Sequence, residues 1–202
     1  MADVITEAAV ARRTSVLTEN GTTLTTGVTA DDSSFALRTV LPPARRWILR
    51  MTAADALAAQ TIGRFDVGQA VNTLRETAPP KGGACLSARL GPDEWLLIDE
   101  AAGNDATTDV GDGGDFMPEM TAKEPWSLVD ISHRHAAMEL RGTRARDVLN
   151  TGCALNLSDK AFPAGSATRT LFAKADIILM RRLDSGARPY YRLECGRSFG
   201  RY

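Results

Sequence analysis

The chain has 202 residues, which is enough for one large domain or two small ones with a hydrophobic core. Its 24 basic and 25 acidic side chains nearly cancel, so we expect no electrostatic binding to nucleic acid or to an anionic membrane. The three cysteines are widely spaced, and no CxxC pair, secretory leader or long apolar span occurs, which predicts a cytoplasmic protein with reduced cysteines.

The first 34 residues differ from the rest in composition. They are rich in Thr and Ser and show no sustained apolar period, which is typical of a segment that cannot bury enough surface to order itself. We therefore predict a flexible N-terminal arm over residues 1–34, free or laid along a partner. Two subdomains are predicted to follow it, over residues 35–121 and 122–202.

The first predicted subdomain opens with strands and a short helix. Alternating apolar residues predict one strand that begins at Phe35 and another that runs through Trp47. Thr52 has the position of a helix N-cap, with Asp55 three residues later, and we expect the helix to end near Gly63. The predicted buried face of this helix consists of Ala54, Leu57 and Ala58.

The run LGPDEW, which ends at Trp95, is the most informative part of the chain. Gly91, Pro92 and Asp93 supply the conformations of a tight turn between two strands. Glu94 and Trp95 exceed what a turn needs, because a large aromatic ring must be buried while its indole N–H finds a partner. The run therefore predicts a packed edge or a subunit interface.

An acidic, glycine-rich segment follows over residues 99–115. The spacing of Asp105, Asp109, Asp112 and Asp115 lacks the alternating ligands, central glycine and closing glutamate of an EF-hand loop. We therefore predict a solvated loop that holds no metal.

The second predicted subdomain has a more regular strand pattern. Two strands are predicted over residues 128–131 and 136–141, the second with Glu139 and Arg141 facing outward. Three more are predicted near the end of the chain, over residues 168–172, 177–182 and 191–195.

A second helix is predicted between these strands. Thr143 is its expected N-cap, and Gly152 its expected C-terminal stop. Its buried stripe is predicted to be Ala145, Val148 and Leu149. Antiparallel strands with helices packed on them indicate an α+β fold.

Residues with catalytic chemistry are few. His133 and His135 are the two histidines, and on one strand their rings would share a face, but no third His or Cys stands at ligand spacing. Nucleophile and nucleotide-binding signatures such as GxSxG, GxGxxG and GxxxxGK[ST] do not occur. General base chemistry is open to either ring, but we favour polar contact at a subunit surface and predict no cofactor in this chain.

Several motifs carry a resemblance to known families. Residues 126–172, with the strand motif DISH, resemble the opening module of the aminomethyltransferase (glycine cleavage T-protein) superfamily. Residues 34–202 are more closely similar to the gamma subunit of heterotetrameric sarcosine oxidase. This similarity is carried by LGPDEWLL at 90–97, SHR at 132–134, RTLFAKA at 169–175 and RSF at 197–199.

The resemblance implies a non-catalytic subunit that works with alpha, beta and delta subunits. In such complexes sarcosine is oxidatively demethylated to glycine, tetrahydrofolate accepts the one-carbon unit, and O2 gives H2O2. FAD, FMN, NAD and tetrahydrofolate are implied in the partner subunits. The family also implies an aromatic-rich C-terminal helix, which we expect to be cut to one turn at Tyr202.

Two alternatives stay open. The first is the equivalent subunit of a related secondary-amine dehydrogenase, of the N-methylglutamate type. The second is a folate-binding aminomethyltransferase-like protein, because Asp176 falls near an acidic position of the folate-dependent enzymes, although it is also explained as a strand-start residue.

Six residues are predicted to contact partner subunits. Buried aromatic side chains contribute much of the binding energy at interfaces, which favours Trp47 and Trp95 as anchors. The polar members of the predicted interface are Glu94, His133, Arg134 and His135.

Overall fold

The computed structural model describes residues 18–19, 22–23, 37–41, 44–78, 83–100, 125–183 and 188–200. Most of the predicted arm lies outside these ranges, as do Phe35, Tyr202 and the acidic segment from residue 101 onward. Within the arm the structure places two short paired strands, β1 (Thr18–Glu19) and β2 (Thr22–Thr23). None of the helices in the described ranges is both long and apolar enough to cross a membrane.

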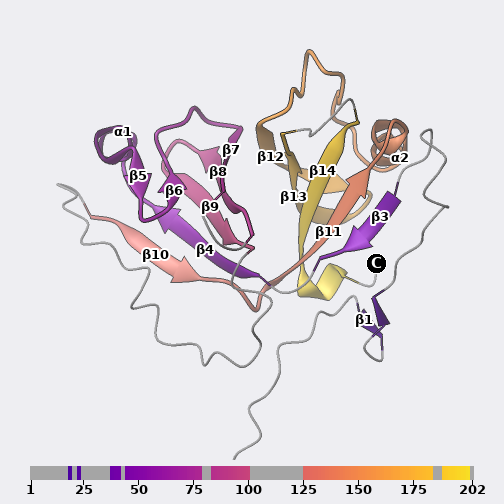
Figure 1. Ribbon diagram of the computed structural model, residues 1–202, viewed down its shortest axis with the longest axis horizontal. Coiled ribbons are helices and arrows are strands. Elements are labelled where there is room, and N and C mark those ends of the chain that lie inside the picture. Colours follow the sequence, from indigo (N-terminus) through magenta and orange to yellow (C-terminus); the bar gives the residue numbers. More distant parts are fainter. Residues whose placement is uncertain are drawn as a thin grey trace, which may run out of the picture.

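One ten-stranded antiparallel sheet forms the framework of the molecule (Figure 1). Its strand order is β10-β4-β9-β8-β7-β12-β13-β14-β11-β3. The strands are β3 (Leu37–Val40), β4 (Arg45–Arg50), β7 (Thr73–Thr77), β8 (Cys85–Gly91), β9 (Glu94–Asp99), β10 (Ser127–Asp130), β11 (His135–Arg141), β12 (Ser166–Phe172), β13 (Ala175–Arg181) and β14 (Tyr190–Gly196). The smaller elements are β5 (Thr61–Ile62), β6 (Phe65–Asp66), α1 (Ala53–Ala59), α2 (Ala145–Asn150) and the 3-10 helix η2 (Arg197–Phe199).

The sheet divides into two lobes at the junction of β7 and β12, where Ser166 and Thr73 form the one register pair. The first lobe contains β10, β4, β9, β8 and β7, and the second contains β12, β13, β14, β11 and β3 (Figure 1). The lobes do not follow the order of the chain. The early strand β3 pairs with β11 in the second lobe, and the later strand β10 pairs with β4 in the first. Each lobe is therefore completed by a strand from the other half of the chain.

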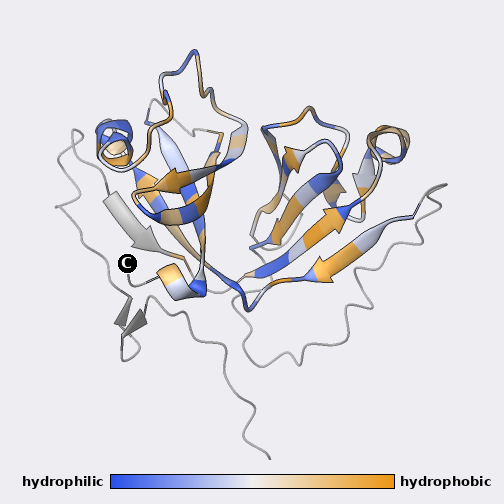
Figure 2. Cartoon of the chain, turned by 180° about the vertical axis from the view of Figure 1, so that it is seen from behind, coloured by the Kyte–Doolittle hydropathy of each residue, from blue (hydrophilic) through white to orange (hydrophobic). Residues whose placement is uncertain are grey.

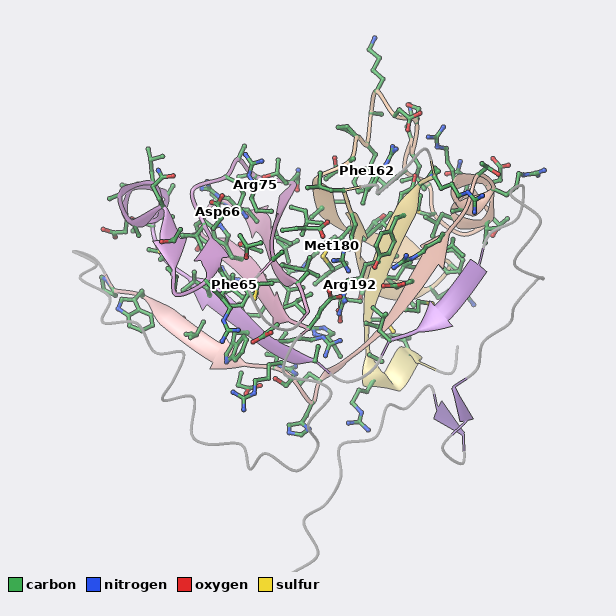
Figure 3. The ribbon with its side chains drawn as sticks, viewed as in Figure 1. Phe65, Asp66, Arg75, Phe162, Met180 and Arg192 are labelled. Atoms are coloured by element: carbon green, nitrogen blue, oxygen red, sulfur yellow. The ribbon has the colours of Figure 1, made fainter. Side chains whose placement is uncertain are left out.

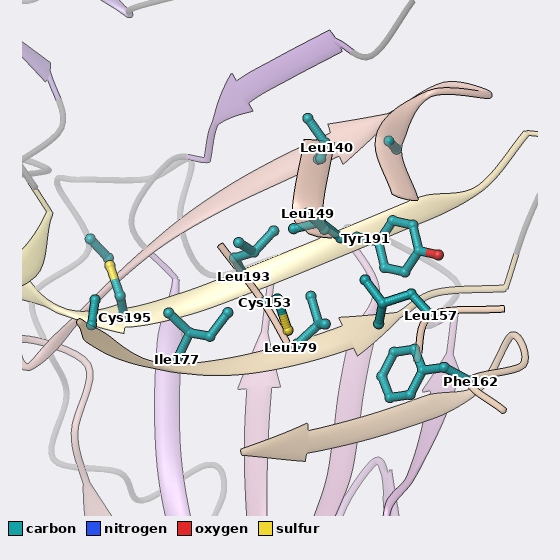
Figure 4. Packing of buried hydrophobic residues seen from close by; sticks show 13 residues of the cluster. Leu140, Leu149, Cys153, Leu157, Phe162, Ile177, Leu179, Tyr191, Leu193 and Cys195 are labelled. Carbon is teal, nitrogen blue, oxygen red and sulfur yellow. The ribbon is translucent and has the colours of Figure 1, made fainter. Parts of the chain in front are cut away.

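Three apolar clusters fill the structure. One lies in the first lobe under α1 and includes Trp47 and Trp95, and another lies in the second lobe under α2 (Figure 4). The third joins the lobes, with Leu86 and Leu96 on one side and Ile178 and Met180 on the other. Figure 2 shows apolar and polar residues alternating along several strands of both lobes, as expected for strands with one face in these clusters.

The local elements agree well with the sequence. The predicted turn joins β8 and β9, and Thr52 caps α1 by accepting a hydrogen bond from the Asp55 backbone N–H. All three cysteines are buried and free of disulfide bonds. In β14 the alternate residues Tyr191, Leu193 and Cys195 are buried in the second-lobe cluster.

The helices are smaller than an α+β fold with packed helices requires, so that fold class is only partly correct. Helix α1 has 7 residues and α2 has 6, and the antiparallel sheet dominates. In α1 the predicted buried face is wrong: Ala56 is its buried residue, while Leu57 is 62% exposed. The helix packs on the first-lobe cluster through Ala56.

Helix α2 also departs from its predicted details. Arg144, rather than Thr143, takes the N-cap position, without a side-chain capping bond, and Val148 is exposed, whereas Ala145 and Leu149 are buried as predicted. Gly152 follows the C-cap as expected. A Cβ atom there would stand 2.9 Å from the Phe172 ring, so close packing against that ring explains the glycine.

Candidate functional site

A chain of buried arginine and glutamate side chains connects the two lobes. At its centre, the fully buried Glu194 carboxylate accepts hydrogen bonds from Arg46 Nε at 2.8 Å and Arg192 Nη2 at 2.6 Å. Arg46 lies on β4 and the other two on β14, so this ion pair crosses between the lobes. Figure 3 shows Arg192 in this position, near Met180. Burial alone would raise the pKa of Glu194, but the charges of Arg192 and Arg46 hold it below its usual value.

The ion-pair chain continues through both lobes. Arg192 also pairs with Glu100, which accepts a hydrogen bond from Arg182 at 3.0 Å, and Arg182 Nη2 reaches Glu76 at 2.8 Å. Arg182 donates a further bond to the hydroxyl of Tyr190 at 2.8 Å. Positive and negative side chains thus alternate along this row of ion pairs, and each has a partner of opposite charge within the protein.

Glu139 lies at one end of this network, and its burial contradicts the prediction that it faces solvent. Its carboxylate accepts hydrogen bonds from the Tyr190 hydroxyl and from Arg141 Nε at 3.0 Å. Burial and the bond to Glu139 raise the pKa of Tyr190 to about 12. The sequence gives little indication of this network. Its charged residues alternate with apolar ones along strands, but the fold covers these strands on both faces. Alternation is usually interpreted as a solvent-facing pattern.

Glu94, in the LGPDEW run, makes a second connection between the lobes. Its buried carboxylate accepts a hydrogen bond from Arg50 Nη2 at 2.5 Å and another from Arg169 on β12. Arg169 stands 75 positions later in the chain, so turn chemistry gives no indication of it. Glu94 therefore ties the first hairpin to the second lobe.

Trp95 is a core residue of the first lobe. Its side chain is fully buried, and the Arg89 guanidinium lies over the ring, 4.7 Å from its centroid. Arg89 also donates hydrogen bonds to the Pro92 carbonyl at 2.6 Å and the Gly91 carbonyl at 3.2 Å, which fixes the turn. The indole Nε1 has no hydrogen-bond partner among the described residues. The chain thus leaves no part of this ring accessible to a partner.

Trp47 is likewise buried, and its ring meets that of Phe65 edge-on with centroids 6.2 Å apart.

His133 and Arg134 are exposed in a turn before β11, while His135 begins the strand and is half-buried. The two imidazoles would share a face only if both lay on one strand, and the structure does not place them so. The interface role of the exposed pair stays a prediction.

Arg169, the partner of Glu94, also lines a groove of about 510 Å³, which we call the polar groove. Its lining includes His135, Arg169, Asp176, Glu194 and Phe199. In the strand register His135 pairs with Gly196, and Ile177 pairs with Cys195, so His135 and Asp176 stand on opposite sides of Gly196. The fold thus brings together two residues that the sequence singled out for separate reasons.

The electrostatics of the polar groove follow from burial. Burial lowers the pKa of His135, Glu194 opposes this shift, and the charges of Arg46, Arg134 and Arg169 add to it. The imidazole is therefore neutral at neutral pH, and its Nδ1 is buried with no hydrogen-bond partner in the described ranges. Asp176 is exposed on the same groove.

These features limit the chemistry that the described residues offer. Burial raises the pKa of Cys195, and the Glu194 charge raises it further, so the thiol is protonated and weakly nucleophilic. Within the described residues, no three His, Cys, Asp or Glu side chains come together in a way that could hold a metal ion. The exposed carboxylate of Asp176 can pair with a cationic group in the polar groove.

Comparison with known proteins places this architecture in a family. A sequence model of the sarcosine oxidase, gamma subunit family matches residues 50–202. Similar proteins include the sarcosine oxidase gamma subunits of Corynebacterium sp. (strain P-1), 32% identical over 107 residues, and of Arthrobacter sp., 31% identical over 104 residues. Each match covers 52% of this chain and 46% of the relative, so the chain spans about half the length of these relatives.

Solved structures show the same fold. The chain resembles one in heterotetrameric sarcosine oxidase from Corynebacterium sp. U-96 in complex with pyrrole 2-carboxylate, with a TM-score of 0.59, 22% identity, and coverage of 84% of this chain and 80% of that one. It also resembles glycine cleavage system aminomethyltransferase T from Bartonella henselae, with a TM-score of 0.59, 12% identity, and coverage of 83% and 44%. Because the family match extends over most of the described fold, the chain belongs to the sarcosine oxidase gamma subunit family.

Proposed function

We propose that this chain is the gamma subunit of a heterotetrameric, cytoplasmic sarcosine oxidase and supports the assembly of the complex rather than its chemistry. The family match over residues 50–202 carries the proposal. The internal pairing of the buried charges supports a structural role, because Glu194 and Arg192 of the second lobe pair with Arg46 and Glu100 of the first. The alpha, beta and delta subunits would then hold FAD, FMN, NAD and tetrahydrofolate and demethylate sarcosine.

Co-expression of the tagged chain with the other three subunits tests this role. We expect the subunits to co-purify in fixed ratio with bound flavin, and the chain alone to be colourless and inactive. Reduction of the flavin by sarcosine, but not by N-methylglutamate, would separate the two secondary-amine substrates. Recovery of the chain as a monomer, while the other subunits assemble into a fully active enzyme without it, would contradict the proposal.

A folate-binding role is the second candidate, because Asp176 is exposed in the polar groove opposite His135. Such a carboxylate could pair with an amine of a pterin. If this role holds, calorimetry with tetrahydrofolate should give a binding heat that Asp176→Asn abolishes. Asp147→Asn, at an exposed acidic residue of α2, is the matched control and should retain it. An absence of heat with the unaltered chain would remove this candidate.

A further inference from the structure

An apolar cavity adjoins the polar groove. It encloses about 420 Å³ between α2 and strands β11, β13 and β14, and its lining is almost wholly apolar, with Met138, Leu149 and Leu193 among its residues. By the strand register the two spaces lie on opposite faces of the second-lobe sheet, because Asp176 and Glu194 share one face and Ile177 and Cys195 share the other. Ile177 and Phe199 line both spaces, so the two meet at one end of the sheet, and we call them together the joined groove.

Exposed apolar side chains gather along the joined groove. Val148 is 43% exposed beside the apolar cavity, Leu171 is 51% exposed beside the polar groove, and Phe199, between the two, is 38% exposed. Each comes from a different element, α2, β12 or η2, and the fold places them around one end of the sheet, with Val148 on one face, Leu171 on the other and Phe199 lining both spaces. Exposed apolar side chains that gather beside polar residues are typical of a protein-binding site.

The charges in the joined groove are not balanced. Arg169 is paired with Glu94, and Glu194 is paired with two arginines, while His135 is neutral. Asp176 forms no ion pair with any residue that the structure describes, and it is exposed next to Leu171, its cross-strand neighbour. One uncompensated negative charge therefore stands at the polar end of an apolar surface.

We propose that the joined groove is the docking site for a segment of a partner subunit that carries apolar side chains and one Lys or Arg placed to pair with Asp176. This inference rests on the proposed subunit function and specifies the surface that the function uses. The segment would pass around the end of the sheet, so that its apolar side chains cover Val148 on one face, Leu171 on the other and Phe199 between them. The basic side chain would fix the position of the segment, because complementary charge at an interface sets register and specificity.

Two substitutions on the joined groove test the proposal within the co-expressed complex. Leu171→Lys places a charge on the apolar surface, and Asp176→Lys reverses the charge that a basic partner residue needs. We expect each to weaken association by about tenfold or more, the scale of an interface hot spot, while Asp176→Asn has a smaller effect. The matched control is Leu57→Lys, at another exposed leucine, on α1 in the first lobe, which should assemble normally.

The possible outcomes are distinct. All these positions are exposed, so each variant should keep the melting temperature of the unaltered chain, which separates lost docking from lost folding. Normal assembly of both Leu171→Lys and Asp176→Lys would overturn the docking proposal and leave the subunit function standing. Failure of the unaltered chain to assemble would overturn both. A dimer of the chain alone that Leu171→Lys dissociates would identify a second copy as the occupant and would also overturn the proposal.

Discussion

Replacing Glu194 with glutamine should lower the free energy of unfolding by about 3–5 kcal/mol, the usual cost of removing one partner from a buried ion pair. The carboxylate is fully buried, and it neutralises Arg192 on its own strand and Arg46 across the boundary between the lobes. Glutamine keeps the size and one acceptor but removes the charge. Chemical denaturation of the purified chain, followed by circular dichroism, measures the loss.

Asp159→Asn is a matched control for this variant. Asp159 also bridges two arginines, Arg146 and Arg181, each at 2.6 Å, but it is 69% exposed. Solvent screens an exposed pair, so we expect a much smaller loss of stability from this change. A loss from Glu194→Gln as small as that expected for an exposed pair would show that the buried network does not hold the lobes together.

The effect of Glu194→Gln should depend on pH in a defined direction. Because the pKa of Glu194 in the folded chain lies below its ordinary value of 4.5, its ionised form stabilises the protein above that pH. The stabilisation is lost as the pH falls through the folded-state pKa, where the carboxyl takes up a proton. The difference in unfolding free energy between the unaltered chain and the variant should therefore be largest near neutral pH and shrink on acidification.

Local signals in the sequence predicted the local structure. The cap at Thr52, the Gly-Pro-Asp turn and the alternating apolar residues of β14 each act over a few positions, and each was found where expected. Both helices were predicted to be short, but α1 ends at Ala59 rather than near Gly63, and α2 spans only Ala145–Asn150 between the predicted limits Thr143 and Gly152. The dominance of the sheet was not predicted, because strand pairing by the surrounding segments is not visible within the helices themselves.

Contacts between distant segments account for most of what the sequence did not reveal. Arg46 and Glu194 are 148 positions apart, and the exchange of β3 and β10 between the lobes is a property of the whole topology. Family resemblance identified the segments with LGPDEW and RTLFAKA, and the structure shows that Glu94 of the first binds Arg169 of the second. The two motifs thus form one contact, which gives a physical reason for their occurrence together in this chain.

Trp95→Ala should destabilise the first lobe by about 3–5 kcal/mol, because it empties a fully buried site in the cluster around Trp47. It also removes the ring under Arg89, which fixes the turn. Trp95→Phe should cost much less, since a ring remains and the deleted indole N–H has no hydrogen-bond partner in the described ranges. Thermal denaturation of both variants measures the difference, with Trp126→Ala, a half-buried residue of the same cluster, as the control.

The same pair of variants distinguishes a core role for Trp95 from the interface role that the sequence suggested. A core residue affects assembly only through folding, so Trp95→Phe should bind the partner subunits as the unaltered chain does whenever its melting temperature is retained. Normal stability of Trp95→Phe combined with loss of assembly would show that the ring is recognised by a partner, which would require the lobe to open on binding. A loss of stability in Trp95→Phe equal to that in Trp95→Ala would instead show that the indole N–H has a partner, and that the hairpin depends on it.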